Sequence, residues 1–131
     1  MNSVVALAFV SCCLSLAACQ IRICPHQEHL SEELRNCNGP KLSNNSVLDK
    51  LSKISERYEE LCAAKLVPGS TLAELWAHRC ADKHFNTLFY RCWADMLGTD
   101  DLLNSSGLNS RDVAVYKKAL ECEFHVLGIE V

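Results

Sequence analysis

The sequence lacks the short motifs that mark the common enzyme classes. It contains no GxSxG nucleophile turn, no HExxH metalloprotease motif and no glycine-rich phosphate loop. Catalysis needs a nucleophile paired with a base, or paired carboxylates in a pocket, and no stretch of the chain spells out either arrangement. We therefore expect no catalytic residue and no enzymatic activity.

An excess of positive charge is also missing. The chain has 13 Lys and Arg against 16 Asp and Glu, which gives a formal net charge of −3 at pH 7. Nucleic-acid binding requires a basic face, and peptides that lie on anionic membranes are usually cationic. The composition therefore argues against both a nucleic-acid partner and a membrane-disrupting mode of action.

Charged side chains are absent from residues 4–19, VVALAFVSCCLSLAAC. This apolar run is short for a membrane span, and its length fits a secretory signal peptide. Cleavage before Gln20 suits the small residues that precede it, with a cut before Cys19 as the alternative. The letters LAAC also match a bacterial lipoprotein box, in which Cys19 would be lipidated. We expect residues 1–19 to form a signal peptide and residues 20–131 to form one secreted domain.

Three of the nine cysteines lie in the expected signal peptide, and the remaining six are an even set. No CxxC pair of the kind found in zinc sites occurs among them. An even set in a small secreted domain indicates three disulfides, although six cysteines allow 15 pairings. The expected disulfide cysteines are Cys24, Cys37, Cys62, Cys80, Cys92 and Cys122.

The apolar residues recur with helical spacing along nearly the whole mature chain, and no segment alternates with the period of a strand. Thr71 and Glu74 form a capping box, and Pro25 suits the first position of a helix. The expected helices cover residues 25–37, 46–65, 71–80, 82–96 and a stretch from 110 onward, with a short turn at 100–103. The fold class is thus an all-α, small disulfide-stapled bundle of four or five short helices.

The apolar stripes of these helices predict which side chains face the core. A core this small needs covalent staples for stability. The residues expected to face inward are Leu30, Leu34, Leu48, Leu51, Ile54, Tyr58, Leu61, Leu72, Leu75, Trp76, Phe85, Leu88, Phe89, Met96, Val113, Tyr116, Leu120 and Phe124, together with most of the cysteines.

Two sequons for N-linked glycosylation occur, at Asn44 (NNS) and Asn104 (NSS). Both lie in polar, turn-like stretches in which a glycan would stand in solvent. We expect Asn44 and Asn104 to be the glycosylation sites of a glycoprotein.

The histidines are the only candidates for site chemistry. His26 and His29 are three positions apart in CPHQEHL, so a helix puts both rings on one side, with Glu33 one turn further on. Imidazole suits Cu(II), Ni(II) and Zn(II). A tight site needs a further ligand, which His125 could supply if the two ends of the domain meet. We therefore expect a metal site at His26, His29 and His125, with two exposed histidines on a helix as the alternative.

The cysteine spacing resembles that of the microplusin-like family of tick secreted antimicrobial proteins. The resemblance rests on the stretches PHQEHLSEELRN after Cys24, ADKHFNTLFYR after Cys80 and the long segment from Cys92 to Cys122. It implies an all-helical six-cysteine domain that withholds copper from microbes by means of histidines. The sequence departs from the family at QIRI before Cys24, at a carboxyl tail with only His125, and in the position of Cys62. No copper ligand carries over from the family.

These patterns predict a secreted, extracellular host-defence protein of microplusin-like type that acts by sequestering copper and works as a monomer. Two alternatives remain. One is a salivary-type effector that binds host proteins. The sequence does not identify the microbial or host target of the protein. The other is a carrier of small apolar ligands, with a cavity lined by Trp76, Phe85, Phe89 and Trp93.

Overall fold

The computed structural model describes residues 22–37, 45–99 and 101–130. The expected signal peptide and the sequon at Asn44 lie outside these residues. Every regular element within them is helical, and they contain no strand. The all-α prediction is confirmed for this part of the chain. No helix in these three ranges has the length and apolar character needed to cross a membrane.

The elements follow the predicted spans closely, with one difference at the amino end. The expected first helix divides into a 3₁₀ helix followed by a short α-helix, and the expected turn after residue 100 is a single helical turn. In chain order the elements are η2 (Pro25–Leu30), α2 (Ser31–Arg35), α3 (Asn45–Leu66), α4 (Leu72–Ala81), α5 (Lys83–Thr99), α6 (Asp101–Asn104) and α7 (Ser110–Val126).

Side-chain caps explain where α4 and α7 begin. The Glu74 N–H donates to the Thr71 hydroxyl, and the Glu74 carboxylate accepts from the Thr71 N–H, both at 3.1 Å. This confirms the predicted capping box. At α7, the side-chain oxygen of Asn109 accepts a hydrogen bond from the Asp112 N–H at 2.8 Å. Both caps satisfy backbone donors that the first turn of a helix leaves without partners.

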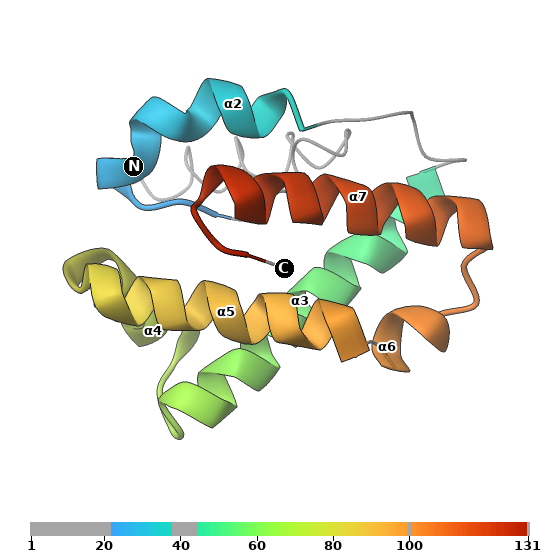
Figure 1. The fold of residues 1–131 in the computed structure, drawn as a ribbon. Helices are drawn as coiled ribbons and strands as arrows, with labels where there is room; N and C mark the ends of the chain where they lie inside the picture. Colours follow the sequence, from blue (N-terminus) through green and yellow to red (C-terminus); the bar gives the residue numbers. More distant parts are fainter. Residues whose placement is uncertain (1–21, 38–44, 100, 131) are drawn as a thin grey trace.

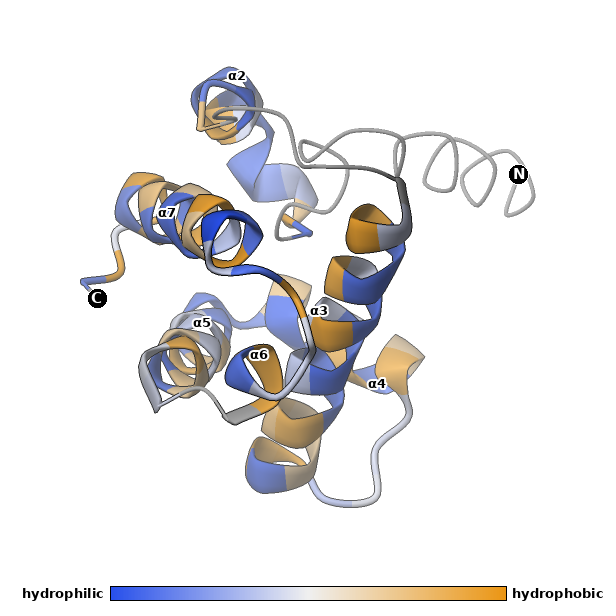
Figure 2. Ribbon diagram, turned by 90° about the vertical axis from the view of Figure 1, so that its right-hand side faces the viewer, coloured by the Kyte–Doolittle hydropathy of each residue, from blue (hydrophilic) through white to orange (hydrophobic). Residues whose placement is uncertain are grey.

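Helix α7 lies between α2 on one side and α5 on the other (Figure 1). Helix α3 runs across this arrangement and packs against α4 and α5. The hydroxyls of Ser55 on α3 and Tyr116 on α7 lie 2.6 Å apart, which links these two helices directly. Figure 2 shows that hydrophobic and hydrophilic residues occupy different sides of α3, as the sequence pattern predicts.

The core forms where α3, α4, α5 and α7 meet. Three of its aromatic rings are in contact, because Phe89 meets Trp93 edge-on at 6.0 Å between centroids and Trp93 lies 6.4 Å from Tyr58. Burial of such rings is the main source of stability in a domain of this size. The buried core residues include Leu51, Tyr58, Leu75, Phe89, Tyr90, Trp93, Leu97, Leu103, Tyr116, Leu120 and Phe124.

Two residues that were predicted to face inward lie at the surface. Leu72 is 52% exposed and Leu88 is 40% exposed. Leu72 occupies the first position of α4, where the helix begins at the surface. On α5 the buried side is turned toward Trp93 and Leu97, so Leu88 falls on its flank. The predicted stripe on α5 is therefore confirmed at Phe85, Phe89 and Cys92 and wrong at Leu88.

Three disulfides join the six predicted cysteines. Cys24 pairs with Cys80, Cys37 with Cys122, and Cys62 with Cys92, at sequence separations of 56, 85 and 30. The first two bonds fasten the amino-terminal segment to α4 and α7, and the third joins α3 to α5. Such bonds stabilise a domain mainly by restricting its unfolded chain, and they are typical of proteins from oxidising compartments.

Candidate metal centre

The segment that carries His26 and His29 begins with a well-defined helix start. Cys24 is extended, Pro25 occupies the first helical position, and η2 follows for six residues. Proline costs nothing at this position, because the N–H that it lacks would have no partner there. The disulfide from Cys24 to Cys80 fixes the start of the turn to α4. The histidine pair therefore lies on a segment that is tied to the core at its first residue.

The 3₁₀ geometry places the two histidines in register. With three residues per turn, side chains three apart eclipse one another, and a rise of about 2 Å per residue separates their Cα atoms by about 6 Å along the axis. His26 and His29 share one column of η2, and both are exposed. Gln27 and Leu30 share the column that is partly buried against the domain. The structure thus brings His26 and His29 to one solvent-facing side.

Gln27 anchors η2 to the core through its side-chain oxygen. Gln27 Oε1 accepts hydrogen bonds from the Cys24 N–H at 2.9 Å, the Tyr90 hydroxyl at 3.1 Å and Asn86 Nδ2 at 3.3 Å. The bond from Cys24 is local and shapes the start of the turn. The bonds from Asn86 and Tyr90 come from α5 and hold the turn against the buried face of that helix.

Behind Gln27 lies a buried guanidinium. Arg79 is only 1% exposed, and its Nε donates to Asn86 Oδ1 at 2.8 Å. Its Cζ lies over the rings of Phe89, Tyr90 and Trp76, at 4.3, 5.0 and 5.3 Å from their centroids. Aromatic faces attract cations, so these rings replace part of the hydration that burial removes.

The same guanidinium holds the residues before Cys24. Arg79 Nη2 donates to the main-chain oxygen of Arg22 at 2.9 Å. The Arg22 guanidinium in turn lies 4.3 Å from the Trp76 ring centroid. The amino end of the described domain is therefore secured by a hydrogen bond, a ring contact and the adjacent disulfide.

Burial perturbs the two ionisable groups in this region. It lowers the pKa of the Arg79 guanidinium, an effect that the neighbouring Tyr90 and Glu59 oppose. Burial raises the pKa of the Glu59 carboxyl, although Arg79 and Arg22 act in the other direction. In both groups, loss of water disfavours the charged form. The region is thus a desolvated support behind the turn.

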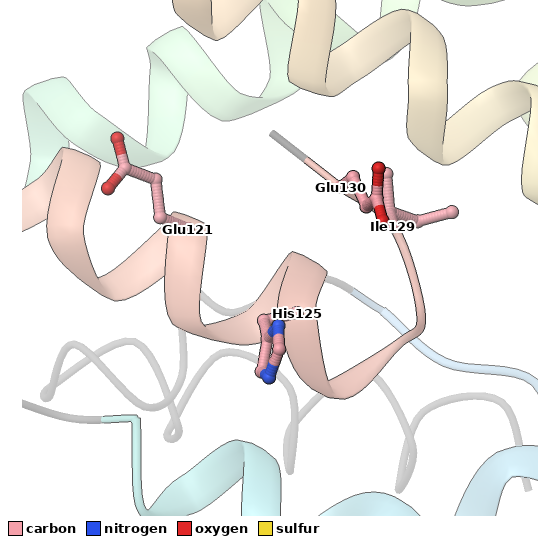
Figure 3. Close-up of a pocket in the computed structure, with 4 residues that line it drawn as sticks. All are labelled: Glu121, His125, Ile129 and Glu130. Carbon is pink, nitrogen blue, oxygen red and sulfur yellow. The ribbon is translucent and has the colours of Figure 1, made fainter.

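His125 belongs to a different element, α7. It is exposed near the end of α7, where it lines an open pocket of about 370 Å³ with Glu121, Ile129 and Glu130 (Figure 3). Figure 3 shows the His125 ring and the Glu121 carboxylate pointing in opposite directions from the helix. The pocket lining therefore does not converge on one point.

Within residues 22–37, 45–99 and 101–130, no three His, Cys, Asp or Glu side chains are grouped closely enough to hold a metal ion together. The structure therefore does not bring His125 or Glu33 into one group with His26 and His29. Two imidazoles supply donor nitrogens of the kind that Cu(II), Ni(II) and Zn(II) accept, and water or another molecule would have to complete the coordination.

The other expected site residues are placed as follows. Asn104 is exposed at the end of α6, as a glycosylation site requires. Of the four aromatic residues that were candidates to line a ligand cavity, Phe85, Phe89 and Trp93 belong to the packed core and Trp76 is half-buried beneath Arg22. Their role is accounted for by packing.

Sequence reasoning missed the supporting network of Arg79, Asn86 and Gln27. One signal was present, because Arg79 follows Leu75 by four residues and so occupies an inward position of α4. A charged residue on an apolar stripe indicates a buried partner, and here the partners are Asn86 and three aromatic rings. Gln27 gave no comparable signal, since two of its three partners, Asn86 and Tyr90, lie far away in the sequence.

Comparison with known proteins identifies no relative of this chain. No family model matches it, no curated protein matches it, and no solved structure matches it.

Proposed function

We propose that the protein is a secreted host-defence protein that withholds a transition metal from microbes, and that it binds Cu(II) through His26 and His29. The observation that carries the proposal is the position of these two exposed imidazoles in one column of a 3₁₀ turn. The turn is held by a disulfide at Cys24 and by the hydrogen bonds of Gln27. Ligands that are held in place before binding lose less entropy when they bind.

Charge and disulfide content support the rest of the proposal. Three disulfides fit a protein that matures in an oxidising compartment and acts outside the cell. The net charge of −3 fits starvation of the microbe better than lysis of its membrane. The resemblance in cysteine spacing to microplusin-like proteins agrees with this mode of action. A carrier role for apolar ligands has less support, because three of the four expected lining residues, Phe85, Phe89 and Trp93, are core residues.

Native mass spectrometry of the secreted, deglycosylated protein with one equivalent of Cu(II) tests the proposal. We expect one retained copper in the wild type and none in the double variant His26→Ala, His29→Ala. The matched control is His84→Ala, which removes another exposed histidine and should keep the copper. Copper retention by the double variant, or none by the wild type, would contradict the proposed site.

The His125→Ala variant separates the pair from a three-histidine site. Because His125 belongs to no three-ligand group among the residues that the structure describes, we expect this variant to bind copper like the wild type. The biological part of the proposal is tested by growth inhibition of a bacterial culture. Inhibition should disappear when excess copper is added and when both His26 and His29 are replaced.

A further inference from the structure

We propose that Gln27 is a positioning residue that sets the orientation of His26 and His29 toward a shared metal ion. This inference rests on the proposed function, and it adds a residue that would not touch the metal. Gln27 lies between the two histidines in sequence but points the other way, into the domain, where its oxygen accepts three hydrogen bonds.

The local hydrogen bond of Gln27 shapes the start of η2. The local bond from the Cys24 N–H to Gln27 Oε1 ties the residue before Pro25 to the third residue of η2. This bond is the half of a capping box in which the side chain of the third helical residue accepts from the N–H before the helix. A capping box fixes how the chain enters a helix. In a 3₁₀ turn, residues three apart eclipse, whereas in an α-helix they diverge by about 60°. The bond therefore fixes the entry of the chain into the turn in which His26 and His29 share a column.

The donors that hold Gln27 from α5 are themselves fixed in position. Asn86 and Tyr90, which donate to Gln27 from α5, are each only 2% exposed. The amide of Asn86 has a fixed direction, because its oxygen accepts from Arg79 Nε and its nitrogen is thereby turned toward Gln27. Arg79 is itself enclosed by aromatic rings. Gln27 is thus hydrogen-bonded to well-buried residues of the core. These bonds restrict the movement of the turn relative to α5.

Loss of the Gln27 side chain would remove these constraints on the turn. In the Gln27→Ala variant, three donors lose their acceptor, all of them on buried residues, and the turn loses its tie to α5. The disulfide from Cys24 to Cys80 and the α3–α5 disulfide remain, so the domain stays folded. Both histidines also remain, but their relative orientation is no longer fixed. Removal of a residue that orients metal ligands typically weakens metal binding by about 10- to 100-fold.

Titration of Cu(II) into the secreted protein, followed by calorimetry and by electron paramagnetic resonance, tests the inference. We expect Gln27→Ala to lower the copper affinity by about 10-fold or more and to reduce the nitrogen splitting from two imidazoles toward one. Gln27→Glu keeps an acceptor oxygen at the same position and should restore both. The matched control, Glu28→Ala, truncates an exposed side chain in the same turn and should bind like the wild type.

The outcomes separate this inference from the proposed function. If the wild type binds copper through both histidines and Gln27→Ala binds it equally well, the positioning role is wrong and the proposed function stands. If Gln27→Glu fails to restore binding, the role of the acceptor oxygen is wrong. If the wild type binds no copper, the proposed function fails and the positioning role fails with it. Hydrogen exchange of α3 and α5 in each variant confirms that the fold is intact.

Discussion

The buried guanidinium of Arg79 donates a hydrogen bond to the main-chain oxygen of Arg22, 57 positions earlier in the sequence and 2.9 Å away. One side chain on α4 therefore holds the amino end of the domain while it also orients Asn86 and fills a space between three aromatic rings. Stability and the geometry of the histidine turn depend on the same residue.

Arg79→Ala should therefore destabilise the domain by about 3 kcal/mol or more, since it removes charged hydrogen bonds and ring contacts and leaves Asn86 without its donor. The midpoint of urea unfolding, with the disulfides intact, measures the change. Arg91→Ala on the exposed side of α5 is the control and should change stability by less than about 0.5 kcal/mol. Equal midpoints for the two variants would show that the buried network contributes nothing.

Glu59 predicts a pH dependence of stability. Burial raises the pKa of its carboxyl from 4.5, so the native state holds this proton more tightly than the unfolded chain. The contribution of Glu59 is fully present below pH 4.5 and is lost as the pH rises through the higher native pKa. Glu59→Gln should therefore be more stable than the wild type at neutral pH, and the difference should vanish in acid.

Urea unfolding between about pH 3 and about pH 8 checks this prediction. Glu121→Gln removes one charge from an exposed position and so measures the effect of net charge alone. A Glu59→Gln variant that is less stable than the wild type at neutral pH would show that attraction to Arg79 and Arg22 outweighs the cost of burying the carboxylate.

Leu72 and Leu75 form a matched pair on α4, because the first is 52% exposed and the second only 1%. Leu75→Ala should cost about 2–5 kcal/mol through lost burial and a cavity, whereas Leu72→Ala should cost less than about 0.5 kcal/mol. Thermal or urea unfolding distinguishes the two. Similar losses would mean that the first turn of α4 is covered in solution.

Asn104 predicts a glycan on the exposed end of α6. When the protein is secreted from a eukaryotic host, Asn104→Gln should lose the mass of one enzyme-removable glycan. Asn36→Gln replaces an exposed asparagine outside any sequon and should keep the glycan, with a mass changed by one methylene group alone. A change of one methylene group alone in Asn104→Gln would rule out modification at this position.

The helices could be predicted from sequence because their signals are local. The capping box at Thr71 and Glu74 and the stripe containing Tyr58 on α3 depend only on neighbouring residues, and both are confirmed. On α5 the predicted stripe is confirmed at Phe85, Phe89 and Cys92 and wrong at Leu88, because how far the buried side extends depends on where α3 and α7 lie. Local spacing gives the period of a helix but not the position of its neighbours.

Contacts between residues far apart in the chain could not be predicted from the sequence for the same reason. Fifteen pairings were open to six cysteines, and the choice follows from tertiary packing. The bonds that hold η2 against α5 come from Asn86 and Tyr90, far along the chain. In the candidate site, the common side of His26 and His29 was predictable from their spacing, whereas the lack of a three-ligand group with His125 among the described residues was not.

The order of the disulfides along the chain has a consequence for biosynthesis. A polypeptide that enters an oxidising compartment amino end first exposes Cys24, Cys37 and Cys62 before any of their partners arrives, since these are Cys80, Cys122 and Cys92. Every bond among the three early thiols is non-native and must be reopened by thiol exchange. Yield during secretion should therefore depend on a disulfide isomerase more than on the intrinsic stability of the finished domain.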